Sequence, residues 1–169
     1  AQNGIITKTD ANNEKLKFQF DTANRLSEVD LINSSNQTTA TYTYQYTAAN
    51  QLKHAIYPGG QTNYDYGTAF GISDFFDLPY TITEFGKDIG FEYDHEDRIT
   101  RIDYPDNMGS ICYVYDADGR ILRVGRIQEG VASTSCSESG VDITSYEYDG
   151  KGRLKTINFP NGVETFVEY

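Results

Sequence analysis

The sequence repeats one short phrase, and this repetition limits the folds that the chain can adopt. FEYDHEDRITRIDYPDN at 91–107 is nearly the same as YEYDGKGRLKTINFPNG at 146–162. Each copy holds two aromatic residues one position apart, an acidic turn, an Arg and a second turn built on Pro. A catalytic loop normally occurs once, whereas a repeated unit builds an architecture in which each copy packs on the next.

The aromatic pairs predict β-strands. Alternation along a strand puts both aromatic residues on one face and the residue between them on the other. Aromatic side chains also favour the pleated surface of a sheet. The pairs are Phe18/Phe20, Tyr44/Tyr46, Tyr64/Tyr66, Phe91/Tyr93, Tyr113/Tyr115 and Tyr146/Tyr148, with a weaker copy at Val167/Tyr169. We expect this aromatic ladder to form the concave or core face of a sheet.

A tight turn follows each pair. Asp comes directly after four of the pairs, and a residue that tolerates a left-handed backbone lies three positions further on. This spacing predicts a hairpin loop built on a type I turn, with the Asp accepting backbone N–H groups. The leading residues are Asp21, Asp94, Asp116 and Asp149, and the left-handed ones are Asn24, Asn50, Asp97, Gly119 and Gly152.

An Arg begins the return strand in four copies, at Arg25, Arg98, Arg120 and Arg153. Leu or Ile follows each Arg, and the next apolar residue comes three positions later instead of two. That spacing predicts either a β-bulge or a strand covered on both faces. The recurring Arg also predicts a partner in the neighbouring hairpin, either a Glu or the face of a Tyr.

A second turn closes each repeat, at YPGG (57–60), YPDN (104–107) and FPNG (159–162). Pro, as at Pro160, presets φ, and we expect Gly60, Asn107 and Gly162 to take a positive φ. One repeat is therefore two strands and two turns. The chain is predicted to be all-β, with tandem antiparallel hairpins forming one long, twisted and curled sheet.

The repeats predict one array over residues 1–169, with about six to seven copies. Spacing between copies places inserted loops near 31–41, 67–77 and 128–140, and ISDFFD (72–77) is compatible with a single helical turn. The last residues fall inside a copy of the phrase, so we expect the chain to be a fragment of a larger protein.

The phrase YxYDxxGRL…PNG resembles the YD repeat of the RHS family, best at 91–107, 113–121 and 146–162. The resemblance implies a segment of a hollow β-shell, as in bacterial toxin complexes, polymorphic toxins and teneurins. In the bacterial members such a shell encloses a C-terminal toxin and carries a self-cleaving protease with a DPxG sequence, which does not occur here. Copies built on Thr47 and Gly67 lack the Asp, and Gln51 replaces the Arg, so a longer or looser turn is expected there.

The charge and cysteine content of the chain limit the kinds of partner and compartment that it fits. The net charge of −11 disfavours nucleic acid and anionic membrane surfaces. No apolar run is long enough for a transmembrane helix, and no signal segment is present. Cys112 and Cys136 either pair, which would tether the loop near 128–140, or remain two thiols; the sequence does not decide between them.

Catalytic and metal-binding patterns are weak. His54 and His95 have no nucleophile or metal-ligand spacing around them. The cluster around Asp94 and the pair Asp116/Asp118 lack the terminal Glu of a calcium loop, so turn capping explains them better. No enzyme activity and no cofactor are predicted.

The sequence therefore favours a non-enzymatic shell segment, secreted or at the cell surface through bacterial export. Its partners would be the rest of its own shell and an enclosed toxin domain. The alternative is an adhesion or carbohydrate-binding module that uses exposed Tyr rings, and open sheet edges would allow self-association. Asn33 and Asn36 fit the glycosylation pattern, which matters only in a eukaryotic secreted protein.

Overall fold

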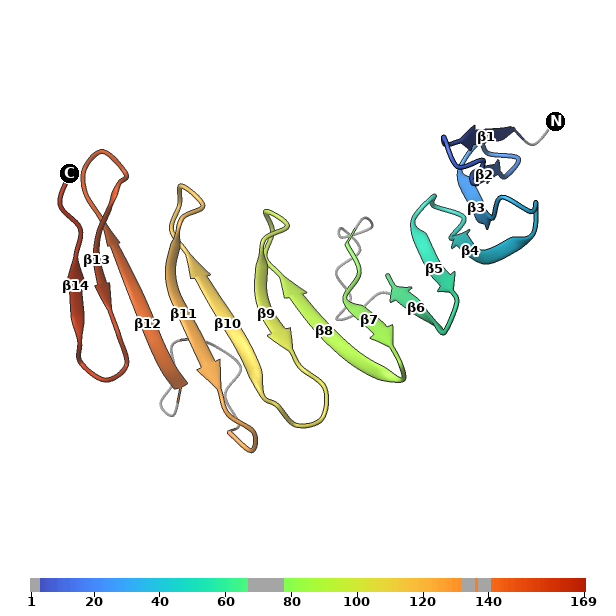
Figure 1. Cartoon of the computed structure of the whole chain (residues 1–169). Coiled ribbons are helices and arrows are strands. Elements are labelled where there is room, and N and C mark those ends of the chain that lie inside the picture. The colour runs from blue at the N-terminus through green and yellow to red at the C-terminus, as the bar shows by residue number, and fades with distance from the viewer. Residues whose placement is uncertain (1–3, 67–77, 132–135, 137–140) are drawn as a thin grey trace. The chain divides into compact units, whose positions relative to one another are not determined.

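The computed structural model describes residues 4–66, 78–131, 136 and 141–169. All regular secondary structure in these residues is β-strand (Figure 1). The strands are β1 (Ile5–Thr9), β2 (Lys15–Phe20), β3 (Leu26–Ile32), β4 (Thr38–Tyr46), β5 (Leu52–Tyr57), β6 (Gly60–Asp65), β7 (Thr81–Glu84), β8 (Lys87–Tyr93), β9 (Ile99–Asp103), β10 (Ser110–Tyr115), β11 (Ile121–Ile127), β12 (Val141–Tyr148), β13 (Leu154–Asn158) and β14 (Glu164–Phe166). In the described part of the chain, no helix is long and apolar enough to span a membrane.

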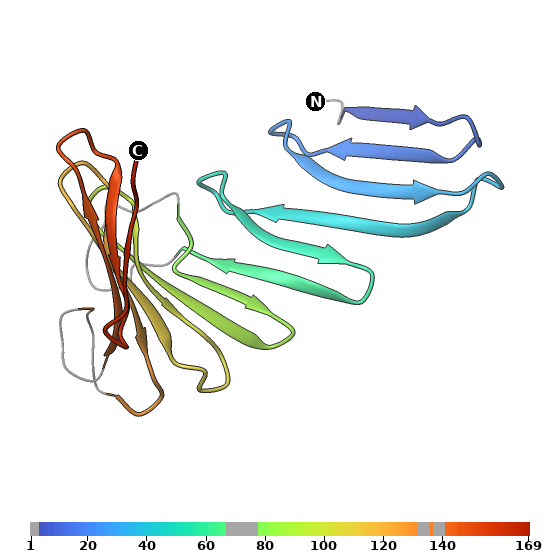
Figure 2. The ribbon, with the colours of Figure 1, turned by 60° about the vertical axis from the view of Figure 1, so that its left-hand side comes forward.

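Hydrogen-bonded neighbours follow chain order from β1 to β14, which confirms the predicted antiparallel meander of hairpins. The chain divides into two compact units, Ala1–Gly86 and Lys87–Tyr169. Figure 2 shows strands β1 to β6 of the first unit lying side by side in sequence order. The second unit holds β8 to β14 in the same kind of succession.

Register sorts the side chains onto two faces. In the first unit Phe18 pairs with Val29, and Val29 with Tyr42, so aromatic and aliphatic residues share one face. In the second unit Tyr113 pairs with Val124 in the same way. Gln45, Glu92 and Glu147 lie between paired aromatics and are exposed. The predicted alternation is confirmed.

In the described hairpins, a β-bulge lies in the return strand after every turn that follows an aromatic pair. Gln19 pairs with Glu28 but Phe20 pairs with Leu26, which leaves Ser27 as an extra residue. The same register shift gives one extra residue in each strand that pairs with Tyr46, Tyr93, Tyr115 or Tyr148. The extra residue explains why the next apolar position comes three places after the first. Of the two predicted explanations, the bulge is confirmed.

The second turns differ from one another. Asn107 and Gly162 have φ values of 61° and 80°, as expected. The prediction for Gly60 is wrong, because Gly59 takes the positive φ, at 104°. Tyr57 pairs with Gly60, so Pro58 and Gly59 are the two central residues of this hairpin, and the second of them needs the left-handed region. Gly60 is instead the first residue of β6.

The most buried apolar residues do not lie on the aromatic face. The members of the six aromatic pairs are all half-buried, whereas Tyr169 of the weaker copy is 72% exposed; the buried apolar residues of the described chain are Cys112, Ile127 and Cys136. Cys112 and Ile127 alternate with aromatic-face residues along β10 and β11, so they belong to the opposite face. Of the expected concave or core face, the core alternative is wrong for the second unit, because its buried apolar residues lie on the face opposite the aromatic ladder.

The expected inserted loops have different outcomes. Segment 31–41 is not a loop, because β3 continues to Ile32, β4 begins at Thr38, and a tight turn joins them. The two strands are simply long. Residues 67–77, which include Gly67 and ISDFFD, lie outside the described residues, as does most of 128–140.

Candidate functional site: the junctions between repeats

The first turn of each repeat is organised by the side chain of its leading residue. In the hairpin that begins at Asp94, Oδ1 accepts the backbone N–H groups of Glu96 and Arg98, both at 3.0 Å. Asp97 donates its backbone N–H to the carbonyl of Asp94 and has a φ of 61°. The turns at Asp21, Asp116 and Asp149 repeat these bonds at 2.9 Å. Asn24, Asn50, Gly119 and Gly152 also have positive φ, which confirms the predicted turn.

The other oxygen of the Asp holds the Arg. Arg98 Nε and Nη2 both lie 2.6 Å from Asp94 Oδ2. In the three equivalent turns Nε donates to Oδ2 at 2.7 to 2.8 Å. One carboxylate thus closes the turn and fixes the direction of the guanidinium. Charge-assisted bonds of this kind are stronger than bonds between neutral groups.

The Arg reaches from its own hairpin onto the next. Its guanidinium carbon lies 4.5 to 4.8 Å from the centre of an aromatic ring in the following repeat, within the range of a cation–π contact. The pairs are Arg25/Tyr46, Arg98/Tyr115, Arg120/Tyr148 and Arg153/Tyr169. Of the two partners expected for the Arg, the structure selects the Tyr face.

The Tyr returns the contact to the first hairpin. Its hydroxyl donates to the carbonyl of the residue that follows the Arg, so Tyr115 bonds to Ile99 at 2.7 Å. Tyr46 bonds to Leu26 and Tyr148 to Ile121 in the same way, both at 2.8 Å. Arg98 Nη1 also lies 3.4 Å from the carbonyl oxygen of Asp116, the first residue of the next turn. Each junction therefore joins two hairpins through an Asp, an Arg and a Tyr.

The charged members of the junction shift one another's pKa values. For Asp21, the backbone and side-chain hydrogen bonds from Arg25 hold the carboxyl pKa below its usual value. For Asp94, partial burial raises the pKa, but the hydrogen bonds from Arg98 and Glu96 outweigh it and the net direction is down. The bond to Asp94 raises the pKa of Arg98. Partial burial raises the pKa of Tyr115.

The turn at Thr47 keeps the same geometry although Thr replaces Asp. Thr47 Oγ1 accepts the N–H groups of Ala49 and Gln51 at 3.2 Å, and Asn50 has a φ of 67°. The expectation of a longer or looser turn is wrong here, because a hydroxyl oxygen satisfies the same two donors. The ion pair with an Arg is what this turn lacks.

Two further turns of this type were missed because no aromatic pair precedes them. Asp10 Oδ1 accepts from Asn12 and Glu14 at 2.9 and 2.8 Å, and Asn13 has a φ of 63°. Asn33 Oδ1 accepts from Ser35 and Gln37, with Asn36 at 61°. The signal was present as Asp or Asn followed three residues later by Asn. Asn33, a residue of the glycosylation pattern, thus serves as a turn residue.

The residues considered for catalysis have structural partners. His54 Nδ1 lies 2.7 Å from Asn63 Oδ1, and His95 is exposed in a turn. Glu96 pairs with Arg98, and Asp118 pairs with Arg120, so an Arg compensates each acidic turn. Within the described ranges, no group of three or more His, Cys, Asp or Glu residues could hold a metal ion.

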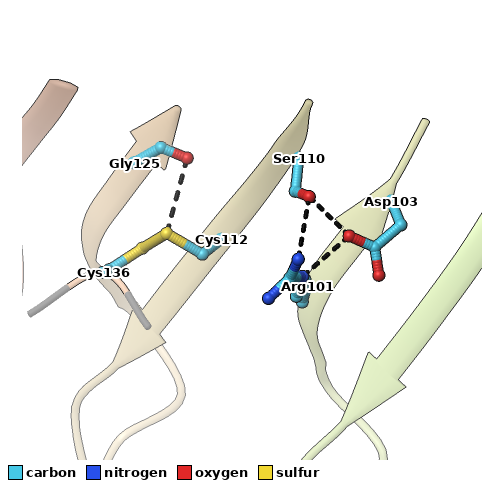
Figure 3. Close-up of a disulfide and its surroundings, with 6 residues drawn as sticks. All are labelled: Arg101, Asp103, Ser110, Cys112, Gly125 and Cys136. Carbon is cyan, nitrogen blue, oxygen red and sulfur yellow. Dashed lines mark hydrogen bonds and ion pairs between the residues drawn. A yellow bond between two sulfur atoms is a disulfide. The ribbon is translucent and has the colours of Figure 1, made fainter. Parts of the chain in front are cut away.

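A disulfide joins Cys112 in β10 to Cys136 in the connection between β11 and β12. Figure 3 shows it beside Gly125 and next to a polar trio on the neighbouring strands. In the trio, Arg101 Nε donates to Asp103 at 2.8 Å, and Ser110 bonds to the same carboxylate. The sequence left the pairing of the two cysteines open, and the structure shows them paired.

Gly125 makes room for the disulfide. A Cβ at this position would lie 2.7 Å from Val141 Cγ1, 2.8 Å from Cys112 Sγ and 3.0 Å from Cys136 Sγ. Real Cβ contacts are not this short, so only Gly fits between Val141 and the disulfide. Sequence reasoning missed this role, and the only signal is a Gly inside a strand, which often marks a close approach of another segment.

The hairpins, their left-handed turns and the Asp–Arg–Tyr junctions define an array of YD-type repeats. The chain matches the Teneurin YD-shell family over residues 1–132, and it belongs to this family. No curated protein sequence matches it significantly.

Solved toxin complexes share the fold. The chain resembles a Tc holotoxin pore of Photorhabdus luminescens with a TM-score of 0.67 and 18% identity, over 95% of this chain and 9% of that one. It resembles TcdB2-TccC3-Cdc42 with a TM-score of 0.66 and 18% identity, over 95% and 8%. The values for TcdB2-TccC3-TEV are 0.69 and 16%, over 96% and 9%. The chain thus spans less than a tenth of each of these three chains.

Proposed function

We propose that the chain is a non-enzymatic wall segment of an RHS/YD-repeat shell, and that the complete shell encapsulates a C-terminal toxin or effector domain. The observation that carries this proposal is the junction between Asp, Arg and Tyr. It recurs between successive hairpins, so it extends a sheet by one repeat at a time. Membership of the YD-shell family and the likeness to toxin-complex structures support the same function.

The partners of this wall would be the rest of its own repeat array and the enclosed domain. One array of six to seven repeats would contribute to a larger polypeptide, and export to the outside of a bacterial cell fits an acidic, disulfide-bonded chain. The wall would act physically, because a continuous hydrogen-bonded sheet separates the enclosed domain from proteases.

Contacts of the Tyr residues favour wall packing over sugar binding. Sugar platforms need free ring faces, yet an Arg covers one face of Tyr46, Tyr115 and Tyr148, and their hydroxyls bond to backbone carbonyls. The remaining glycan hypothesis concerns the first aromatic of each pair. Alanine substitutions at Tyr113 and Tyr146 on a glycan array test it directly.

Limited proteolysis of the complete parent polypeptide tests encapsulation. We expect its C-terminal domain to survive trypsin for much longer inside the parent than as an isolated domain. The double variant Arg98→Ala/Arg120→Ala loosens two junctions and should speed the loss of that domain, whereas Arg123→Ala/Arg126→Ala changes two exposed Arg residues and should not. Equal cleavage rates for the enclosed and the isolated domain would contradict the proposal.

A further inference from the structure

Phe85 is a bulky residue in a backbone conformation that suits small or polar residues. Phe85 and Gly86 are the two residues between β7 and β8, and their φ values are 51° and 72°. Two-residue hairpin turns with positive φ favour Asn or Asp followed by Gly. Every other non-Gly residue with a positive φ in the described chain is Asn or Asp. The turn itself therefore does not explain why this residue is a Phe.

Burial does not explain the Phe either. Phe85 is 71% exposed, more than any other Phe that the structure describes. A bulky side chain in the left-handed region costs free energy, and here no burial in the sheet offsets that cost. Strain of this kind is typical of positions that serve a function.

A second aromatic ring lies beside Phe85. A Cβ on Gly60 would lie 3.0 Å from Cε1 of Phe85 and 3.2 Å from both Cε2 and the hydroxyl oxygen of Tyr57. The two rings therefore meet over Gly60, which has no side chain to separate them. Tyr57 ends β5 and Phe85 follows β7, so the two rings come from neighbouring hairpins of the first unit.

A carboxylate lies next to these rings. The Tyr57 hydroxyl donates a hydrogen bond to Glu84 Oε1. Glu84 is exposed, and no Lys or Arg of the described chain forms an ion pair with it. Lys87, the next cation along the chain, pairs with Asp106 instead. An exposed carboxylate thus stands beside two aromatic rings without a cation from the described residues.

The junctions between repeats show what such a combination binds. In each junction an Asp carboxylate holds the nitrogens of an Arg while a Tyr ring covers the face of the guanidinium, as with Asp94, Arg98 and Tyr115. Tyr57, Glu84 and Phe85 supply the same two kinds of group, a carboxylate and aromatic rings. The net charge of −11 also favours a cationic partner over an anionic one.

We propose that Tyr57, Glu84 and Phe85 form a docking site for an Arg side chain on a basic segment of a partner molecule. The second carboxylate oxygen of Glu84 receives the guanidinium nitrogens, and the exposed ring of Phe85 stacks on the guanidinium plane. Arg fits better than Lys, because a planar guanidinium can bond to a carboxylate and stack on a ring at the same time. The proposal does not depend on what the wall encloses, so it and encapsulation can fail separately.

Titration of the chain with short peptides at low salt, followed by nuclear magnetic resonance, tests the site. The probe is a blocked Gly-Gly-Arg-Gly-Gly peptide, and the same peptide with citrulline, the neutral analogue of Arg, is its control. We expect saturable shifts of the Phe85 and Tyr57 ring signals with the Arg peptide only. The absence of saturable shifts, or equal shifts with citrulline, would overturn the proposal. Equal affinity for the corresponding Lys peptide would overturn the assignment to a guanidinium.

Three variants locate the binding. Glu84→Gln removes the charge but keeps an acceptor for the Tyr57 hydroxyl, and Phe85→Ala removes the ring. Each should weaken binding of the Arg peptide about fivefold. Phe166→Ala is the matched control, because Phe166 is 66% exposed in another hairpin, and it should leave the affinity unchanged. Equal losses in all three variants would show that the peptide binds without a defined site.

Phe85→Asn separates docking from folding. Asn suits the left-handed region, so this variant should unfold at a higher urea concentration than the unchanged chain, and it should lose the shifts caused by the Arg peptide. That result would show that Phe85 is kept for binding at the expense of stability. A lower unfolding midpoint would show that the Phe85 ring serves packing on Gly60, and it would contradict the proposal.

Discussion

The guanidinium carbon of Arg98 lies 4.7 Å from the centre of the Tyr115 ring, and the two residues belong to different hairpins. The Tyr115 hydroxyl bonds in return to the carbonyl of Ile99, next to that Arg. Two contacts in opposite directions fix how far one hairpin can slide along the other. The Arg thus recurs at one place in the repeat because a Tyr ring of the next repeat contacts it there.

Removing the Tyr115 hydroxyl tests the return contact. Tyr115→Phe keeps the ring beneath Arg98 but loses the bond to the Ile99 carbonyl, so the free energy of unfolding should fall by about 1 kcal/mol. Urea denaturation followed by circular dichroism measures the change. Tyr104→Phe is a suitable control, because Tyr104 is exposed, and it should leave the unfolding midpoint unchanged.

Replacing Arg98 by Lys tests the shape of the cation. Lys keeps the charge but presents a single ammonium group, which cannot bond to Asp94 through two nitrogens while stacking on Tyr115. The denaturation midpoint should fall, and Arg123→Lys, at an exposed position, should not change it. A double-mutant cycle of Arg98→Lys with Tyr115→Phe should show non-additive losses, because the two residues share one junction. Additive losses would mean that the two contacts act independently.

The left-handed turn residue can be tested against a second Gly in the same turn. Gly152 has a φ of 78°, whereas Gly150 in the same turn has no positive φ and open space around its missing Cβ. Gly152→Ala should cost about 1–2 kcal/mol through backbone strain, and its Cβ would in addition push Arg120 Nη1, 2.8 Å away, aside. Gly150→Ala should be close to neutral, and equal losses in the two variants would argue against the assigned conformation. Thermal unfolding of both variants gives the comparison.

Stability should depend on pH through the turn carboxylates. The pKa values of Asp21, Asp94, Asp116 and Asp149 all lie below their usual value in the folded chain. A lowered folded-state pKa contributes stability that is fully present above the unfolded-state pKa of about 4 and is lost as the pH falls through the folded-state value. Urea midpoints should therefore drop as the pH falls below the unfolded-state pKa of about 4. The variant Asp94→Asn should be less stable at pH 7 and show a smaller drop on acidification.

Much of the local structure could be predicted because it depends on neighbours in sequence. The turn at Asp94 needs an acceptor, a left-handed residue three positions later and an extra residue in the return strand. Each of these features can be recognised in the sequence. The partner of Arg98 could be narrowed only to a Glu or a Tyr face, since Tyr115 lies 17 positions further along the chain. Such contacts depend on how strands of different repeats pair with one another.

The disulfide could not be predicted for the same reason. The 24 positions that separate Cys112 from Cys136 do not show whether the two residues come together. Aromatic residues recurring at strand spacing suggested a concave or core face, but the paired aromatics are half-buried, and in the second unit the buried apolar cluster lies on the other face. The one local sign was Gly125, whose meaning depends on Val141, Cys112 and Cys136, which lie against it.

Gly125 gives a sharp test of the packing around the Cys112–Cys136 disulfide. Gly125→Ala would force a Cβ against Val141, Cys112 and Cys136, and overpacking of this kind costs about 1–3 kcal/mol. Two of the three close atoms are the disulfide sulfurs, so the loss should be larger in the oxidised chain than in a chain without the bond. In the Cys112→Ser/Cys136→Ser background the two sulfurs are gone and the contact with Val141 stays, so the same substitution should cost less. Urea denaturation of the four proteins measures this coupling, and an equal loss in both backgrounds would show that Gly125 is needed by the strand itself and not by the disulfide.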